Sequence, residues 1–213
     1  MRQRFWTILF VVLTSPLLAQ DPMAEEILNN LSKKYKGYKS FKATYNHTLE
    51  NNAGKVENEQ KGEILVKGEK FKLKLPEVEV FSDGKYSWSW VKKSKEVNLT
   101  EIDPNEEEIT PANVYMLHQR GYKFVLMSEL KGSKGIIQTI DLEPKDLNKE
   151  ITKIRLLIDK STLSILKWIV FERGTNNRSI FEIRQFTPNV PTKDSDFVFN
   201  KALHPEVKLV DLR

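Results

Sequence analysis

The first periodic stretch of the chain follows Asp21-Pro22, a pair typical of a helix N-cap with proline in the first turn. Apolar residues then recur every three or four positions, as on one face of a helix, and these are Ala24, Leu28, Leu31 and Tyr35. Gly37 follows them, and glycine is common at the end of a helix. The pattern predicts one amphipathic helix that ends near Gly37.

From Ser40 onward the hydrophobic period changes to two for most of the chain. The clearest case is the alternation of Phe71, Leu73 and Leu75 with three lysines, which makes one face of that strand apolar and the other cationic. Such a strand belongs to a sheet with one wet face. Beyond it, strands are predicted at 78–81, 86–91, 122–130, 136–142, 151–158, 164–172 and 179–187, and a short Phe197-Val198-Phe199 segment closes the chain.

Two short signals interrupt this strand pattern. Ser82-Asp83-Gly84-Lys85 predicts a tight hairpin, because an Asp-Gly pair tolerates the positive φ angles of a type I′ turn. Residues 110–119 are predicted to form a short helix, since Thr110 suits its cap, Pro111 its first turn and Gly121 its end.

A meander of about ten strands has an apolar face that two short helices cannot cover if the sheet is flat. We therefore expect a strongly curved antiparallel sheet, closed or half closed into a barrel, with the helices as a lid. The predicted fold class is mainly β with a few α-helices, in a single domain over residues 21–213.

The apolar face of this sheet includes Tyr45, Phe71, Trp88, Trp90, Trp168 and Phe186. One interpretation is an ordinary packed core, which the alternation pattern alone favours. The other is a cavity that is kept partly empty for an apolar ligand.

The first twenty residues have the features of a secretory signal peptide. Arg2 and Arg4 form a positive head, and residues 5–13 are apolar except for Thr7. This run is too short for a membrane-spanning helix, which needs about 20 apolar residues. We expect residues 1–20 to be cleaved after export; the alternative is that they remain as an anchor.

The composition excludes several kinds of site. The sequence has no cysteine, which excludes disulfides, thiol nucleophiles, Cys-based metal sites and lipid attachment to a cysteine at the cleavage point. The formal charge of +5 falls to +3 when Arg2 and Arg4 are removed. Lysine and glutamate alternate without a basic stripe, which argues against nucleic acid as a partner.

The sequence contains no recognisable nucleophile elbow, zinc-protease motif, phosphate-binding glycine loop or EF-hand loop. The only histidines are His47, His118 and His204, which lie far apart and are interpreted as structural. The acidic run 103–108 lacks the spaced ligands of a calcium loop and is interpreted as solvated. The sequence therefore indicates no catalytic residues, no metal site and no cofactor.

The order of the motifs resembles that of one known family. The motifs are Ser40-Phe41-Lys42-Ala43-Thr44-Tyr45, then Gly62-Glu63-Ile64-Leu65-Val66-Lys67, Phe71, Ser82-Asp83-Gly84-Lys85 with an aromatic strand, Pro111 in a short helix, and Phe197-Val198-Phe199 before a Val-rich end. Over essentially the whole chain after residue 20, this order is similar to that of the outer-membrane lipoprotein carrier protein family, the LolA family. Each motif is short, so their order and spacing carry the specificity.

The resemblance implies a half-open β-barrel with a helical lid, an apolar cavity and no enzymatic activity. It also implies a periplasmic carrier, which we expect to be a monomer. The partners implied are acylated lipoproteins, the inner-membrane ABC transporter that releases them, and an acceptor at the outer membrane.

The residues predicted to line the acyl-chain cavity are Phe41, Tyr45, Phe71, Leu73, Trp88, Trp90, Leu117 and Trp168. Phe71 matches an aromatic position of the family. The family has an arginine after a Val-Lys pair that is associated with holding the empty lid closed, and Gly68 stands there in this chain. Lys67 or Lys70 are the candidates for another latch.

Three other functions remain open at this stage. The first is a lipid- or glycolipid-binding or sensing module of the same barrel class. The second is a small secreted hydrolase, and the third is a structural partner of an envelope complex. A hydrolase requires a convergent polar cluster in the cavity, and a sensing module is expected to have a second domain or an anchor.

Overall fold

The computed structural model of the chain describes residues 21–51, 53–103, 109–132, 135–174 and 177–213. The predicted signal peptide, residues 1–20, and most of the acidic run, residues 104–108, lie outside the described residues. In the described part of the chain, no helix is long and apolar enough to cross a membrane.

The described chain is mainly β, with one α-helix and short 3₁₀ helices. The helices are α1 (Pro22–Lys36), η1 (Val114–Gln119), η2 (Asp194–Phe197) and η3 (Lys201–Leu203). The strands are β1 (Phe41–Glu50), β2 (Val56–Lys67), β3 (Lys70–Lys74), β4 (Val78–Ser82), β5 (Tyr86–Val91), β6 (Glu96–Glu101), β7 (Tyr122–Gly132), β8 (Gly135–Pro144), β9 (Ile151–Asp159), β10 (Ser164–Glu172), β11 (Arg178–Pro188) and β12 (Lys208–Asp211).

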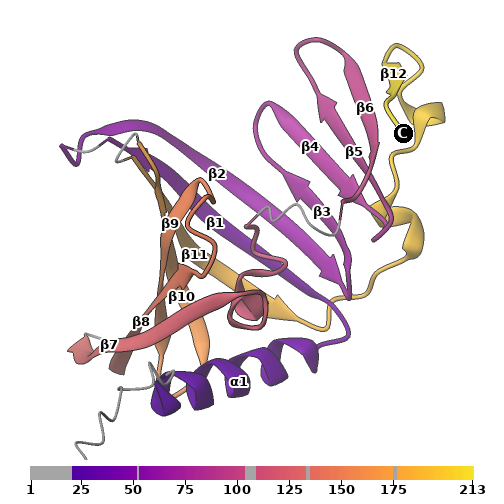
Figure 1. Ribbon diagram of the computed structural model, residues 1–213. Helices are drawn as coiled ribbons and strands as arrows, with labels where there is room; N and C mark the ends of the chain where they lie inside the picture. Colours follow the sequence, from indigo (N-terminus) through magenta and orange to yellow (C-terminus); the bar gives the residue numbers. More distant parts are fainter. Residues whose placement is uncertain (1–20, 52, 104–108, 133–134, 175–176) are drawn as a thin grey trace, which may run out of the picture.

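All twelve strands form one sheet, in the order β12-β6-β5-β4-β3-β2-β1-β11-β10-β9-β8-β7. The end strands β7 and β12 do not pair with each other, so the sheet is not closed. The pairs are antiparallel except β12 with β6, which run parallel and depart from the predicted meander. Figure 1 shows the sheet bending strongly from β7 round to β2, and beyond β3 the strands β4 to β6 stand apart.

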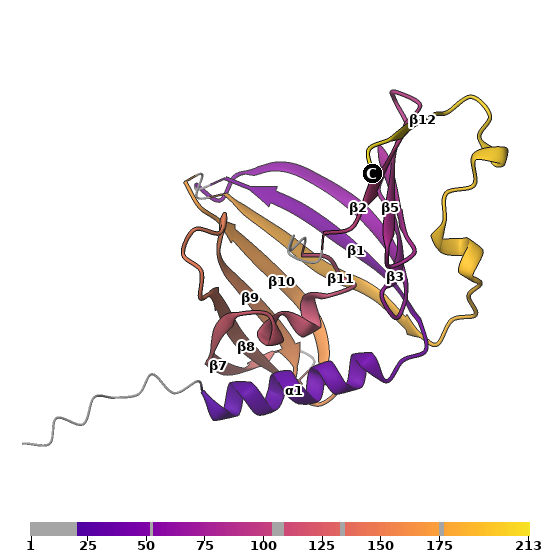
Figure 2. The same cartoon turned by 45° about the vertical axis from the view of Figure 1, so that its right-hand side comes forward.

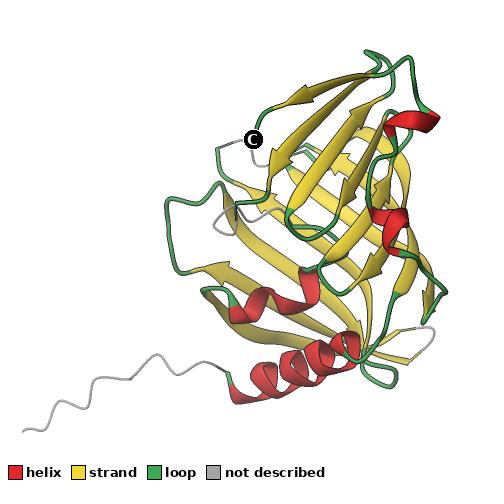
Figure 3. Ribbon diagram, turned by 90° about the vertical axis from the view of Figure 1, so that its right-hand side faces the viewer, coloured by secondary structure: helices red, strands yellow, loops and turns green. Residues whose placement is uncertain are grey.

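Helix α1 forms where its pattern predicts. The Asp21 carboxylate accepts hydrogen bonds from the backbone N–H groups of Met23 (2.9 Å) and Ala24 (3.3 Å), and Gly37 caps the other end. Its apolar stripe, which includes Leu28 and Leu31, is fully buried. Figures 2 and 3 show α1 lying across one open end of the curved sheet, with η1 above it.

The register of the strands defines two faces of the sheet. On β1, β2, β3 and β4, Ala43 pairs with Ile64, Ile64 with Leu73, and Leu73 with Val80. These side chains share one apolar cluster with α1 and η1, and we call their side of the sheet the inner face. The opposite side is the outer face.

A second apolar cluster lies on the outer face of the arm, by which we mean β4, β5 and β6. Phe81 pairs with Trp88, and Trp88 with Leu99. The cluster is completed by residues of the C-terminal segment 189–213, which we call the strap, including Phe199 and Val207. Figure 1 shows the strap, in yellow, running along the arm.

Several local predictions are corrected. The hairpin at Asp83 and Gly84 forms, but only Gly84 has a positive φ, so the turn is not type I′. The Asp83 carboxylate instead accepts hydrogen bonds from the backbone N–H groups of Lys85 and Tyr86.

Strand β6 was not predicted, because its polar residues obscure the alternation. The helix predicted at 110–119 is shorter and 3₁₀, because residues 111–113 form a turn. Phe197 ends η2 and forms no strand.

Candidate functional site

The inner face forms a continuous apolar surface beneath the two helices. Five of the eight predicted cavity residues are buried in it, and Phe71 packs against it. The buried ones are Phe41, Tyr45, Leu73, Leu117 and Trp168. They come from β1, β3, η1 and β10, so the curvature of the sheet gathers residues that are distant in the sequence.

Gly62 explains how Tyr45 fits into this surface. The two residues are paired across β1 and β2, and a Cβ atom on Gly62 would lie 2.3 Å from Cζ of Tyr45. Because no real Cβ approaches so closely, the Tyr45 ring lies over the backbone of β2 only if residue 62 is glycine.

The interior of the concave surface is filled rather than empty. The space between the inner face, α1 and the start of η1 measures about 10 Å³. Its lining comprises Tyr35, Phe41, Ala43, Pro111, Val114, Ile165, Trp168, Ile183 and Phe186. Ligand sites generally measure about 300 to 1,000 Å³. This space is therefore too small for an acyl chain, and Pro111 and Val114 occupy part of it.

A larger hollow of about 380 Å³ lies beside the helices, and we call it the mouth pocket. Its lining comprises Tyr35, Lys36, Tyr38, Ser40, Phe41, Val66, Gly68, Glu69, Tyr115, Met116, Gln119 and Arg120. The rings of Tyr35 and Tyr115 are stacked with centroids 5.0 Å apart. Tyr35 and Phe41 line both this pocket and the filled interior, so the two spaces are adjacent.

A further hollow, of about 660 Å³, lies along the middle of β1 and β2 and beside the end of β3. Its lining mixes charged residues, which are Lys61, Glu63, Lys74 and Arg184, with apolar ones such as Tyr45, Leu75 and Pro76.

Helix α1 is fixed to the sheet at both ends. The Asp21 carboxylate accepts a hydrogen bond from the backbone N–H of Leu126 on β7, at 2.9 Å. The Tyr35 hydroxyl accepts one from the N–H of Ile165, at 3.2 Å, and burial raises the pKa of Tyr35 to about 12. Lys34 donates to the carbonyl of Thr162 at 2.6 Å. These contacts are mainly to backbone atoms, which ties the helix to the strands themselves.

The polar contacts of η1 run to α1. His118 Nε2 lies 3.2 Å from the Asn29 side-chain oxygen, and Lys36 donates to the Gln119 side-chain oxygen at 3.0 Å. The other His118 ring nitrogen is buried without a hydrogen-bond partner. Burial, and to a smaller extent the Lys36 charge, hold the pKa of His118 below its ordinary value.

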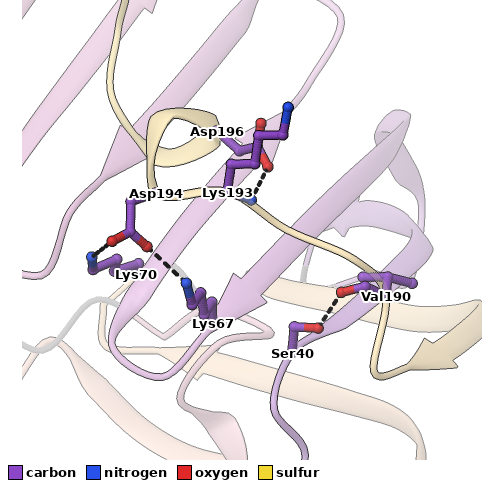
Figure 4. A network of polar contacts seen from close by, with 7 residues as sticks. All are labelled: Ser40, Lys67, Lys70, Val190, Lys193, Asp194 and Asp196. Atoms are coloured by element: carbon purple, nitrogen blue, oxygen red, sulfur yellow. Dashed lines mark hydrogen bonds and ion pairs between the residues drawn. The ribbon is translucent and has the colours of Figure 1, made fainter.

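The candidate latch residues Lys67 and Lys70 contact the strap, at the first residue of η2, and the ion pairs described for them do not reach α1 or η1. Their ammonium groups lie 2.8 and 3.3 Å from the two carboxylate oxygens of Asp194 (Figure 4). Near them, the Ser40 hydroxyl donates to the carbonyl of Val190 at 2.5 Å. Gly68, between the lysines, has a φ of +59°, a conformation that favours glycine over arginine.

Trp88 and Trp90 lie apart from the other six predicted residues. Both belong to the outer-face cluster of the arm, where the Trp90 and Phe199 rings have centroids 5.8 Å apart. The parity of β5 places them on the side opposite Phe71 and Leu73. The structure therefore does not bring them to the apolar interior.

Other interior residues were not among the eight predicted. Tyr115 and Val114 on η1, and Phe181 on β11, line or pack against the same cluster. Their signal was present in the helix and strand patterns, but periodicity does not rank residues within one face. The three histidines do not converge, and the described residues contain no group of three side chains able to hold a metal ion.

Comparison with known proteins gives a consistent assignment of family and fold. The model of the family described as outer membrane lipoprotein carrier protein LolA matches residues 36–200. No curated protein sequence matches the chain significantly.

Three solved structures illustrate the structural likeness. An uncharacterized conserved protein from Thermus thermophilus has a TM-score of 0.60 at 11% identity, covering 88% of this chain and 98% of that one. A putative outer membrane lipoprotein-sorting protein domain from Vibrio parahaemolyticus has a TM-score of 0.49 at 14% identity, covering 85% and 97%. A LolA superfamily protein from Nitrosomonas europaea has a TM-score of 0.45 at 11% identity, covering 83% and 97%.

Proposed function

Because the chain belongs to the family of the outer membrane lipoprotein carrier protein LolA, we propose that it binds the acyl chains of lipoproteins against its inner face. In this proposal the curved sheet acts as a half-open barrel and the helices as its lid. The protein carries its ligand through the periplasm and catalyses no reaction.

The observation that supports this proposal best is the way in which the apolar interior is covered. The inner face is a large concave apolar surface, and η1 with the preceding turn fills it with few side chains, among them Pro111, Val114 and Leu117. The mouth pocket lies where this filling segment meets the sheet. Displacing the segment would expose an apolar groove that begins at the mouth pocket.

The contacts of the two helices suggest which of them moves. Helix α1 is bonded to the backbone of β7 and β10, whereas the polar contacts described for η1 run to α1 side chains. We infer that η1 and its preceding turn leave the interior, while α1 keeps its place on the sheet. This assignment refines the expectation that both helices move as one lid.

The energetics explain why such a carrier needs a large apolar surface. An acyl chain of about 15 methylenes loses on the order of 12 kcal/mol when it leaves a membrane, at roughly 0.8 kcal/mol per buried CH₂. Polar contacts alone do not offset a loss of this size. A carrier must therefore offer hydrocarbon contacts, and a segment that refills the interior lets the ligand be displaced by an acceptor.

The partners follow from the same proposal. The protein, acting as a monomer, would receive acylated lipoproteins from an inner-membrane ABC transporter and pass them to an acceptor at the outer membrane. Depletion of the protein in cells should make lipoproteins accumulate in the inner membrane.

A direct binding experiment tests the proposal. Purified protein lacking residues 1–20 is titrated with a fluorescent fatty acid and with a peptide that carries a palmitoylated N-terminal cysteine. We expect saturable binding of both, and competition between them, because both ligands place a hydrocarbon chain on the inner face. Absence of binding, together with normal lipoprotein localisation after depletion, would contradict the proposal.

A further inference from the structure

Three rings lie in register across adjacent strands of the inner face. His47 on β1 pairs with Phe181 on β11, and Phe181 pairs with Trp168 on β10. The His47 and Phe181 rings are stacked at 4.4 Å, and the Trp168 and Phe181 rings at 4.7 Å. Phe181 is thus held between two rings that each carry nitrogen.

Each of the two rings that flank Phe181 has a buried nitrogen atom without a hydrogen-bond partner. These atoms are Nε2 of His47 and Nε1 of Trp168, and Trp168 is only 1% exposed. Buried polar groups in native proteins are nearly always hydrogen-bonded, so that two such atoms beside one ring require an explanation.

Both nitrogens are hydrogen-bond donors. Gln60 Nε2 lies 3.2 Å from His47 Nδ1, and because an amide nitrogen donates, Nδ1 accepts. The proton of the neutral imidazole is then on Nε2. Burial lowers the pKa of His47, which favours this neutral form. The indole nitrogen of Trp168 is always a donor.

A trapped water molecule is a poor acceptor for Trp168. The interior cavity beside it measures about 10 Å³, the lower limit for one water molecule. A buried water needs two to four polar partners, roughly. The lining side chains offer only the Tyr35 hydroxyl, which already accepts from Ile165, besides the indole itself. The Trp168 donor is therefore left for a ligand that replaces η1 in the interior.

We propose that His47 Nε2 and Trp168 Nε1 form a hydrogen-bonding subsite for the ester or amide carbonyl oxygens of an acylated ligand. This proposal rests on the proposed function, since it requires the ligand to occupy the inner face. The hydrocarbon beyond the carbonyl contacts aliphatic residues of the same face, such as Ile140 and Leu156. The subsite selects acyl chains over ether-linked alkyl chains and fixes how deeply a chain enters.

The test compares two probes that differ only in the carbonyl groups. One is a fluorescent glycerol derivative with two palmitoyl chains in ester linkage, and the other is its dihexadecyl ether. Trp168→Phe removes the N–H and keeps a ring to stack on Phe181. Trp88→Phe, on the outer face of the arm, is the matched control. Dissociation constants are measured by fluorescence titration, and folding is checked by circular dichroism.

We expect Trp168→Phe to weaken binding of the ester probe about three- to tenfold and to change that of the ether probe less than about twofold. His47→Phe should act in the same direction, and Trp88→Phe should affect neither probe. Equal changes for both probes would overturn the subsite and leave the carrier function in place, since the chains still bind. If the wild-type protein binds neither probe, the subsite and the proposed function are both overturned.

Discussion

In the concave region, β1–β3 and β7–β11 present their apolar side chains to α1 and η1, whereas the arm buries apolar side chains on the opposite face of the same sheet. The change occurs at β4, where Val80 still faces inward and the adjacent Phe81 faces the strap. Beyond β4 the inner face becomes polar, with Ser87 and Ser89 at positions that are apolar in the concave region.

The two coverings differ in how they are attached. The strap adds a strand to the sheet, because β12 pairs with β6, and it inserts Phe199 and Val207 into the outer cluster. By contrast, η1 pairs with no strand, and the polar bonds described for it go to side chains of α1. Sheet hydrogen bonds and packing thus cover the arm, whereas the segment that covers the concave region is not paired with any described strand.

The sharpest test of this difference compares two cross-links in a chain that has no native cysteine. Asn29→Cys with His118→Cys ties η1 to α1, and Lys70→Cys with Asp194→Cys ties the strap to β3. The native side chains of these pairs approach to 3.2 and 3.3 Å. With a short cleavable thiol linker, the first pair should lose fatty-acid uptake almost completely and regain it on cleavage, because η1 cannot leave the interior.

The strap cross-link is the control and should leave uptake unchanged, because it does not restrain η1. Normal uptake with the linked helices would show that α1 and η1 leave the sheet together, against the assignment of η1 as the moving part.

A second test uses two half-buried aromatic residues on opposite faces, Phe71 and Trp88. Phe71→Asp places a charge on the inner face and should weaken binding of the fatty-acid probe at least about 100-fold, since it removes apolar contact and adds a desolvation penalty. Trp88→Asp should change binding by less than about threefold once correct folding is established. Fluorescence titration measures both, and similar losses would show that the arm contributes to the ligand site.

This pair also shows what could be predicted from the sequence. Helix α1, most of the strands and the curling of the sheet follow from hydrophobic period, capping residues and the size of the apolar face. Period-two alternation places Trp88 and Trp90 on one face of their strand, but it does not say which face of the sheet that is. Which face they occupy depends on the strap. Its apolar residues are too few and too widely spaced in the sequence to predict that it packs against the arm.

Acidification should loosen η1 by way of His118. This ring is half-buried between Asn29 and Lys36 of α1 and Phe124 of β7. Its pKa is lowered in the closed form, so the open form binds the proton more readily. The stabilisation of the closed form is complete above the ordinary histidine pKa of about 6.5 and is lost as the pH falls through the lowered value.

Hydrogen exchange of the η1 amides, measured at two pH values on either side of that range and corrected for intrinsic rates, checks this prediction. We expect a several-fold increase in opening at the lower pH, and His118→Gln should abolish it while keeping a partner for Asn29. His47→Gln is the control, because it removes the other half-buried histidine whose pKa is lowered by burial. An unchanged pH response in His118→Gln would contradict the assignment.

The turn after β2 is where the carrier family has its lid-associated arginine, but the partner of the lysines in this turn was not predictable from the sequence. The lysines beside Gly68 contact Asp194, which is more than a hundred residues away in sequence, and charge pairs between the ends of separate elements leave no periodic signal. The contacts that do hold η1, at Asn29 and Lys36, involve residues on the polar side of a helix pattern. Such positions are usually solvated.

The smallest expected effect comes from Asp194→Asn, which weakens both ion pairs between the strap and the β2–β3 turn. Its neighbours Lys67 and Lys70 hold the pKa of Asp194 below its ordinary value, but the carboxylate is well exposed, and exposed ion pairs stabilise little. We expect slightly faster exchange of strap amides at low salt, a difference that disappears at high salt because the charges are then screened. Asp211→Asn, at the far end of the strap, is the matched control for loss of an exposed carboxylate.

Uptake of the fatty-acid probe by Asp194→Asn should be unchanged, since the strap covers the outer face of the arm. Faster uptake in Asp194→Asn alone would mean that the strap, which lies beside the rim of the mouth pocket, takes part in opening the interior.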